Sequence, residues 1–70
     1  MAIEKVTLPV ARKIANLTQK QLADIVGVSE NTVINWEKYR SEPTISQAMK
    51  IGDAVGIYYD NIIFLKPNTV

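Results

Sequence analysis

The sequence predicts an all-α, compact domain of five short helices around one hydrophobic core. Residues typical of helix starts and ends recur at short intervals, and between them hydrophobic residues stand three and four positions apart. No segment alternates hydrophobic and polar residues over the length of a strand, and no Asn-Gly or Asp-Gly hairpin turn is present. A chain of 70 residues has room for one core. We place this domain at residues 1–66 and a short tail at residues 67–70.

The first helix is predicted between Thr7 and Asn16. Thr7 is an N-cap candidate, Pro9 suits a first turn that needs no backbone N–H there, and Asn16 tolerates the left-handed conformation that ends a helix. The hydrophobic face of this helix is expected at Val10, Ile14 and Leu17.

The second helix is predicted between Thr18 and Gly27. Thr18 and Gln21 have the spacing of a capping box, in which each residue bonds the backbone N–H of the other. Gly27 favours the turn that ends the helix. The buried face is expected at Leu22, Ala23 and Val26.

The third helix is predicted from about Ser29 to Lys38, after a turn of only about three residues. Val33 and Trp36 are one helical turn apart and are expected to face the core. At about 100° per residue, this orientation sends a second set of side chains to the opposite, outward side. The outward set is Asn31, Ile34, Asn35 and Lys38.

The fourth helix is predicted between Thr44 and Gly56, and the fifth near Tyr59 to Leu65. The fourth has hydrophobic residues at helical spacing: Ile45, Ala48, Ile51 and Val55. The fifth has more hydrophobic surface than one narrow helical face can bury, in Ile62, Ile63, Phe64 and Leu65. These four residues either complete the core or join two copies of the chain in a homodimer.

Composition argues against metal and catalytic chemistry. Cysteine and histidine are both absent, which removes the usual zinc ligands and the commonest general base. An active site would need carboxylates or hydroxyls in a pocket that so small a chain scarcely encloses. We therefore expect no enzyme, no cofactor, no metal and no small-molecule substrate.

No hydrophobic run is long enough to cross a bilayer, and the first ten residues lack the pattern of a signal peptide, so a cytoplasmic location is expected without a membrane partner. The formal net charge is only +1, but basic residues gather between residues 12 and 40. A basic face on a nearly neutral protein can still bind phosphate. The alternative is solubilising charge scattered over the surface.

The stretch from residue 17 to residue 37 resembles the phage-repressor and Cro-like helix-turn-helix regulators, the XRE type. It has the family's Thr-Gln-x-x-Leu-Ala opening at residues 18–23, followed in order by Gly27, Ser29, Val33 and the Trp36-Glu37 pair. The resemblance covers roughly residues 8–64. It implies a lambda-repressor-like DNA-binding domain in which helices 2 and 3 form the helix-turn-helix.

By the same resemblance, the protein is expected to be a sequence-specific regulator that binds double-stranded operator DNA. The closest analogy is a Cro-like repressor of phage or mobile-element origin, which acts as a homodimer and is nucleoid-associated when bound. The alternative is a protein-interaction module of the same fold, an antitoxin or a modulator of a repressor. The near-neutral charge and the outward Ile34 keep this alternative open.

Four residues of the third helix are candidates for reading bases. The amides of Asn31 and Asn35 can pair with adenine N6 and N7, and Ile34 can contact a thymine methyl group. Glu30 can accept a hydrogen bond from cytosine N4, or it merely complements the positive end of the helix.

Another set of residues is expected at the DNA backbone. The basic candidates for phosphate contact are Lys13, Lys20, Lys38 and Arg40. The hydroxyls of Ser29 and Thr32 either contact phosphate or serve the fold, Ser29 as a cap and Thr32 beside the core.

The resemblance assigns roles to three more residues. It implies that Gln19 touches the DNA backbone or orients a side chain of the recognition helix, and that Arg12 pairs with Glu37 to join the first helix to the end of the third. Tyr39 departs from the glycine that the family often has there. It is a further candidate for phosphate contact.

Overall fold

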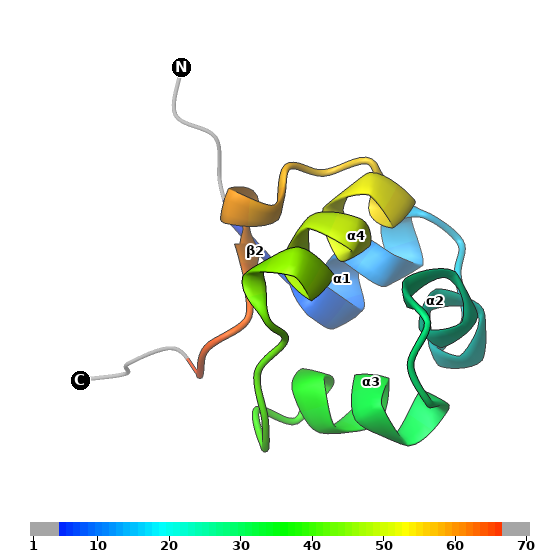
Figure 1. The fold of residues 1–70 in the computed structure, drawn as a ribbon. Helices are drawn as coiled ribbons and strands as arrows, with labels where there is room; N and C mark the ends of the chain where they lie inside the picture. Colours follow the sequence, from blue (N-terminus) through cyan, green and yellow to red (C-terminus); the bar gives the residue numbers. More distant parts are fainter. Residues whose placement is uncertain (1–4, 67–70) are drawn as a thin grey trace.

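The computed structural model describes residues 5–66, which form four α-helices, one 3-10 turn and two very short strands (Figure 1). In chain order these are β1 (Val6–Thr7), α1 (Leu8–Ile14), α2 (Gln19–Val26), α3 (Glu30–Glu37), α4 (Ile45–Val55), η1 (Tyr59–Asn61) and β2 (Ile62–Ile63). The predicted tail and the first four residues of the predicted domain lie outside this range. None of the helices within it is long and hydrophobic enough to span a membrane.

The helix ends follow the local sequence. In the capping box of α2, the Thr18 hydroxyl accepts from the backbone N–H of Gln21 at 3.0 Å, and the Gln21 side chain accepts from the backbone N–H of Thr18 at 2.8 Å. Thr44 and Gln47 form the same arrangement at the start of α4. Gly27 ends α2 with a left-handed φ of 88°. The predicted limits of α2 and α4 are thereby confirmed.

The hydrophobic core lies where the four helices meet. Its largest fully buried side chains are Leu8, Leu22, Val33 and Ile51, and Trp36 packs with them at 3% exposure. The inward faces predicted for α2 and α3 are therefore correct. Ile45, the first of the hydrophobic residues at helical spacing in α4, is 70% exposed, whereas Ala48, Ile51 and Val55 are buried.

The predicted hydrophobic face of α1 is wrong at two of its three residues, since only Leu17 packs partly buried against the core. Val10 and Ile14 are exposed, whereas Leu8 and Ala11 are buried. The true inner face follows helical spacing through residues 8, 11, 12 and 15, and it includes the charged residue Arg12. A charge on the inner face interrupts the hydrophobic pattern, so a reading based on hydrophobicity alone selects the wrong side.

The predicted fifth helix is also wrong. The segment from residue 59 to residue 63 forms η1 and β2, and β2 pairs in parallel with β1 in the register Val6 with Ile62 and Thr7 with Ile63. Thr7 precedes α1 but makes no side-chain capping bond. Residues more than 50 positions apart form this pairing, so no local alternation of hydrophobic and polar residues predicts it.

Candidate nucleic-acid interface

Helices α2 and α3 form two arms joined by a tight turn. Gly27 reverses the chain, the half-buried Val28 packs against the core, and the Ser29 hydroxyl caps α3 by accepting from the backbone N–H of Thr32 at 3.2 Å. Val33 and Trp36 hold the inner side of α3 in the core. As a result, α3 lies along the lower edge of the molecule in Figure 1 with its other side facing away from the protein.

The outward side of α3 carries the four side chains predicted there. Asn31 and Lys38 are exposed, and Ile34 and Asn35 are half-buried. Within residues 5–66, no side-chain hydrogen bond involves either asparagine. Both amides therefore keep their donors and acceptors for a molecule outside the chain.

The first turn of α3 is organised by its own hydroxyls. The Ser29 and Thr32 hydroxyl oxygens are 2.9 Å apart and share a hydrogen bond. Ser29 thus has the capping role considered for it, and Thr32 is half-buried beside it. Glu30 is exposed in the first turn, where a negative charge complements the helix dipole.

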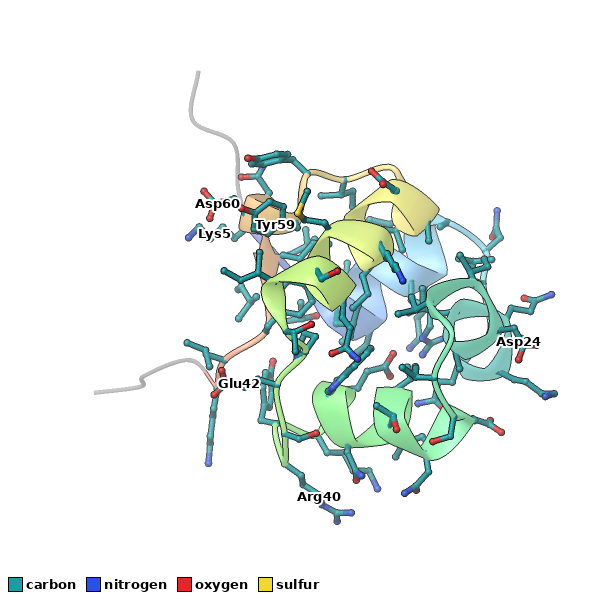
Figure 2. All side chains as sticks on the ribbon, in the orientation of Figure 1. Lys5, Asp24, Arg40, Glu42, Tyr59 and Asp60 are labelled. Atoms are coloured by element: carbon teal, nitrogen blue, oxygen red, sulfur yellow. The ribbon has the colours of Figure 1, made fainter. Side chains whose placement is uncertain are left out.

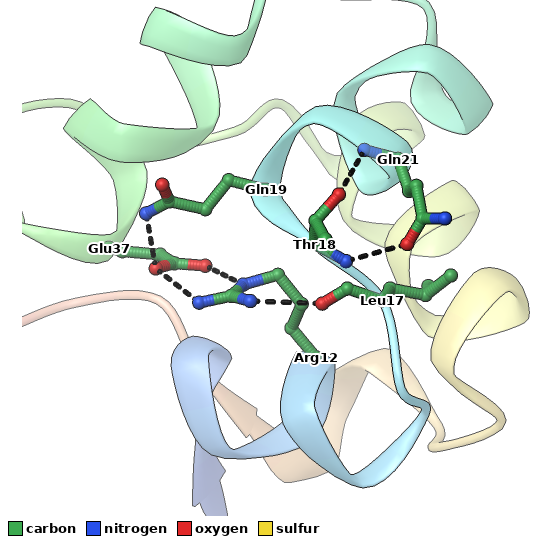
Figure 3. A network of polar contacts seen from close by, with 6 residues as sticks. All are labelled: Arg12, Leu17, Thr18, Gln19, Gln21 and Glu37. Atoms are coloured by element: carbon green, nitrogen blue, oxygen red, sulfur yellow. Dashed lines mark hydrogen bonds and ion pairs between the residues drawn. The ribbon is translucent and has the colours of Figure 1, made fainter.

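A network of polar side chains ties the end of α3 to α1 and α2 (Figure 3). Arg12 Nε donates to Glu37 Oε2 at 2.7 Å, and a second guanidinium nitrogen donates to the Leu17 carbonyl at 2.9 Å. Gln19 Nε2 donates to Glu37 Oε1 at 3.0 Å. The Arg12 and Glu37 side chains are only 12% and 7% exposed, so this ion pair lies largely out of water.

The network defines what Gln19 does in the free protein. The resemblance implies that Gln19 either touches the DNA backbone or orients a side chain of the third helix. The structure shows a contact of the second kind, in which the amide N–H of Gln19 binds Glu37. Arg12 and Glu37 form the ion pair that the resemblance implies. The carboxylate of Glu37 therefore receives donors from both of the preceding helices, which fixes the direction in which α3 points.

The turn after α3 contains a strained tyrosine. Tyr39 has a φ of +60°, in the left-handed region that favours glycine. Its backbone N–H donates to Trp36 O at 3.1 Å, and the N–H of Arg40 donates to Asn35 O at 2.9 Å, the two bonds of a Schellman motif. The turn expected for glycine therefore forms with tyrosine, half-buried, and it leaves Arg40 exposed at the lower edge of the molecule (Figure 2).

An open hollow of about 500 Å³ lies between the end of α1 and the starts of α2 and α3. It brings together Lys13, Gln19 and Glu30, three predicted site residues that are distant in sequence. Asn16 also lines it and is absent from the predicted site. An asparagine just before the Thr18 cap predicts a helix end, which its φ of 59° agrees with, but it does not predict a place in the site.

The remaining predicted residues fall into two groups. Lys20 is exposed on α2 and is only 3.9 Å from Asp24, an ion pair open to solvent. Ile62 is a core residue at 5% exposure, and Leu65 is 59% exposed. Ile63 and Phe64 are half-buried. The predicted dimer set is therefore divided between the core and the surface.

The outward surface of α3 carries hydrogen-bonding groups and one positive charge. Within residues 5–66, no three carboxylate, histidine or cysteine side chains are placed to hold a metal ion. The outward side chains are two neutral amides, an isoleucine and a lysine on a projecting helix. Such a surface can donate and accept hydrogen bonds with an extended, negatively charged ligand.

Two short helices joined by a glycine turn, with the second helix projecting its polar side, define a helix-turn-helix protein. A family model described as Helix-turn-helix matches residues 10–61. The chain belongs to this family.

Three individual proteins are similar to it. An uncharacterized HTH-type transcriptional regulator of Methanocaldococcus jannaschii is 39% identical over 51 residues, which are 73% of this chain and 77% of that protein. Another, of Methanothermobacter thermautotrophicus, is 41% identical over 54 residues, 77% of this chain and 78% of the relative. The fold is similar to that of the P22 c2 repressor in its crystal structure with a synthetic operator, with a TM-score of 0.73, 26% identity, and coverage of 87% of this chain and 89% of the other.

Proposed function

We propose that this protein is a transcriptional regulator that binds double-stranded DNA sequence-specifically by inserting α3 into the major groove. The observation that carries the proposal is the outward side of α3, where two side-chain amides flank a half-buried isoleucine and make no hydrogen bond with the described part of the chain. The names of the two relatives and the repressor-operator complex of the structural neighbour support it.

In this proposal, the side-chain amides and the isoleucine on the outward side of α3 contact the bases. Asn31 and Asn35 are one helical turn apart, so they face neighbouring positions along a groove. Each amide can pair with two atoms of an adenine edge, and Ile34 between them can contact a thymine methyl group. The proposal therefore predicts a site that includes A·T pairs. Glu30 at the start of the same helix is within the same interface and can accept from a cytosine amino group.

Contacts with the DNA backbone would come from the basic residues around α3. Lys38 and Arg40 follow the helix, Lys13 lines the hollow beside its first turn, and Lys20 is exposed on α2. Phosphate contacts supply affinity without sequence preference, whereas the groove contacts supply specificity. Gln19 would act through Glu37, by keeping α3 at the angle that the groove requires.

The proposal extends to a Cro-like repressor of phage or mobile-element origin, which the Thr-Gln-x-x-Leu-Ala opening supports. It acts by occupying its operator in the cytoplasm, as two copies on two half-sites and without catalysis or a cofactor. A single domain with one eight-residue recognition helix contacts only a few base pairs, so two copies are needed for a site of useful length.

Selection of bound sequences from a random DNA pool tests the proposal directly. On the selected site, Asn35→Ala should cost about 1 to 3 kcal/mol with little loss on random DNA. Lys38→Ala should weaken binding to both and reduce the salt slope of log affinity by about 0.9. Lys50→Ala removes another exposed lysine, on α4, and should change neither. Equal losses on both DNAs for Asn35→Ala would refute base reading, and failure to enrich any sequence would favour the protein-interaction alternative.

A further inference from the structure

Asn35 is held more firmly than two of the other outward residues of α3. It is half-buried, whereas Asn31 and Lys38 are exposed. Its backbone carbonyl accepts from the N–H of Arg40 at 2.9 Å, one of the two bonds of the turn that ends the helix. The Asn35 backbone is therefore fixed on both sides, and its half-buried side chain has few directions in which to turn.

The helix around Asn35 is fixed as well. The next residue, Trp36, is 3% exposed in the core. Glu37 accepts from Arg12 at 2.7 Å and from Gln19 at 3.0 Å (Figure 3). A shift of this end of α3 by the width of a methyl group would break these contacts, because a packed core does not deform continuously. The protein therefore presents the Asn35 amide in one position.

The adenine edge that this amide can bind is changed by methylation. On the proposed function, Asn35 Oδ1 accepts from the N6 amino group of an adenine and Nδ2 donates to its N7. In a Watson–Crick pair, one N6 hydrogen bonds thymine O4, and only the other points into the major groove beside N7. A methyl group on N6 of a paired adenine takes the place of this second hydrogen. It removes the donor that Oδ1 needs and puts a carbon atom in its path.

We infer that the protein binds its site when the adenine facing Asn35 has an unmodified amino group and is excluded when N6 is methylated, an inference that rests on the proposed function. The methylated base leaves Oδ1 without a donor in a groove from which water has been displaced, and an acceptor left unpaired there costs its full desolvation energy. Asn31 is exposed in the first turn of α3 and can turn aside, so it tolerates the same modification better. Methylation of one adenine thus decides whether the site is occupied.

Modified duplexes test the inference directly. Each adenine of the selected site is replaced in turn by N6-methyladenine, and the affinity of the wild-type protein is measured by fluorescence anisotropy. Methylation of one adenine in each half-site should lower the affinity about tenfold or more. Methylation of the flanking adenines, outside the selected site, should change it little. At the sensitive adenine, 7-deazaadenine should also weaken binding, because it lacks N7 and keeps the amino group.

Two variants assign the effect to a residue. Asn35→Ala should bind the methylated and the unmethylated duplex equally, because it has no amide that could lose a partner. Asn31→Ala is the matched control, since it removes the other outward amide of α3 and should keep the sensitivity at the same adenine. Equal wild-type affinity for every methylated duplex would overturn the inference, as would a loss that persists in Asn35→Ala.

Failure of the proposed function would look different. No sequence would then be enriched from the random pool, and no duplex would be bound more tightly than random DNA, which would remove the inference together with the function. The inference fails alone when the unmodified site is bound specifically and its methylated forms are bound equally well.

Discussion

Removing Glu37 tests how the recognition helix is held in place. The carboxylate accepts from Arg12 at 2.7 and 3.3 Å and from Gln19 at 3.0 Å. In Glu37→Ala, the Arg12 guanidinium stays largely buried, and among residues 5–66 it keeps only the Leu17 carbonyl as an acceptor. The variant therefore loses an ion pair and also leaves a charge without its counter-ion.

The size of the effect follows from burial. Breaking a buried ion pair by removing one partner costs about 3 to 5 kcal/mol, and the 12% exposure of Arg12 places this case near about 3 kcal/mol. A domain of 70 residues has a total free energy of unfolding of about 4 to 10 kcal/mol. Glu37→Ala should therefore lose a large part of its stability, which urea denaturation followed by circular dichroism measures.

Asp24→Ala is the control for this experiment. Asp24 also pairs with a cation, but the distance is 3.9 Å and the side chains of Lys20 and Asp24 are 71% and 67% exposed. Its loss should change the free energy of unfolding by less than about 0.5 kcal/mol. The double variant Arg12→Met, Glu37→Met should lose much less than the sum of its single changes, since no buried charge remains. If Glu37→Ala is as stable as Asp24→Ala, the network does not hold α3.

Three further changes test the backbone. Gly52→Ala should destabilise the domain by about 1 to 3 kcal/mol, because a Cβ atom there would be 2.7 Å from the Ile57 carbonyl oxygen. The higher helix propensity of alanine alone would raise the thermal midpoint of unfolding. A higher midpoint would therefore contradict the steric argument. In urea denaturation, Tyr39→Gly should be more stable than Tyr39→Ala by about 1 kcal/mol. Both variants lose the aromatic ring, but only glycine adopts the φ of +60° without strain. Equal stabilities would show that the turn is unstrained. Thr44→Ala should lose about 1 kcal/mol by removing the capping box of α4, while Ser46→Ala, exposed in the same helix, should lose little by thermal denaturation.

The sequence predicts the helix limits that neighbouring residues set. The limits of α2 follow from Thr18, Gln21 and Gly27, residues that act on their own neighbours. The last segment behaves differently, since the conformation of Ile62 and Ile63 is set by pairing with the start of the chain. A hydrophobic run predicts burial there, and Ile62 is buried, but it does not distinguish a helix from a strand.

The same distinction applies to the candidate site. The outward side of α3 was predictable because one anchored residue, Val33, fixes the direction of every other residue on a helix. The hollow that joins Lys13 to Glu30 depends on how α1 packs beside α3, which the sequence leaves open. The bond from Gln19 to Glu37 likewise requires two helices to meet at one point. Tertiary packing therefore decides which surface residues of different helices form one site.

The two sides of α3 contribute differently to folding, and on the proposed function only the outward side reads bases. An isolated helix of eight residues is unstable in water, so α3 exists because its inner side is held by Val33, Trp36 and the Glu37 network. The side-chain amides of the outward asparagines make no hydrogen bond within residues 5–66. Changes at Asn31 and Asn35 should therefore alter binding at nearly constant stability. Changes on the inner side should instead weaken folding first, and DNA recognition only as a consequence.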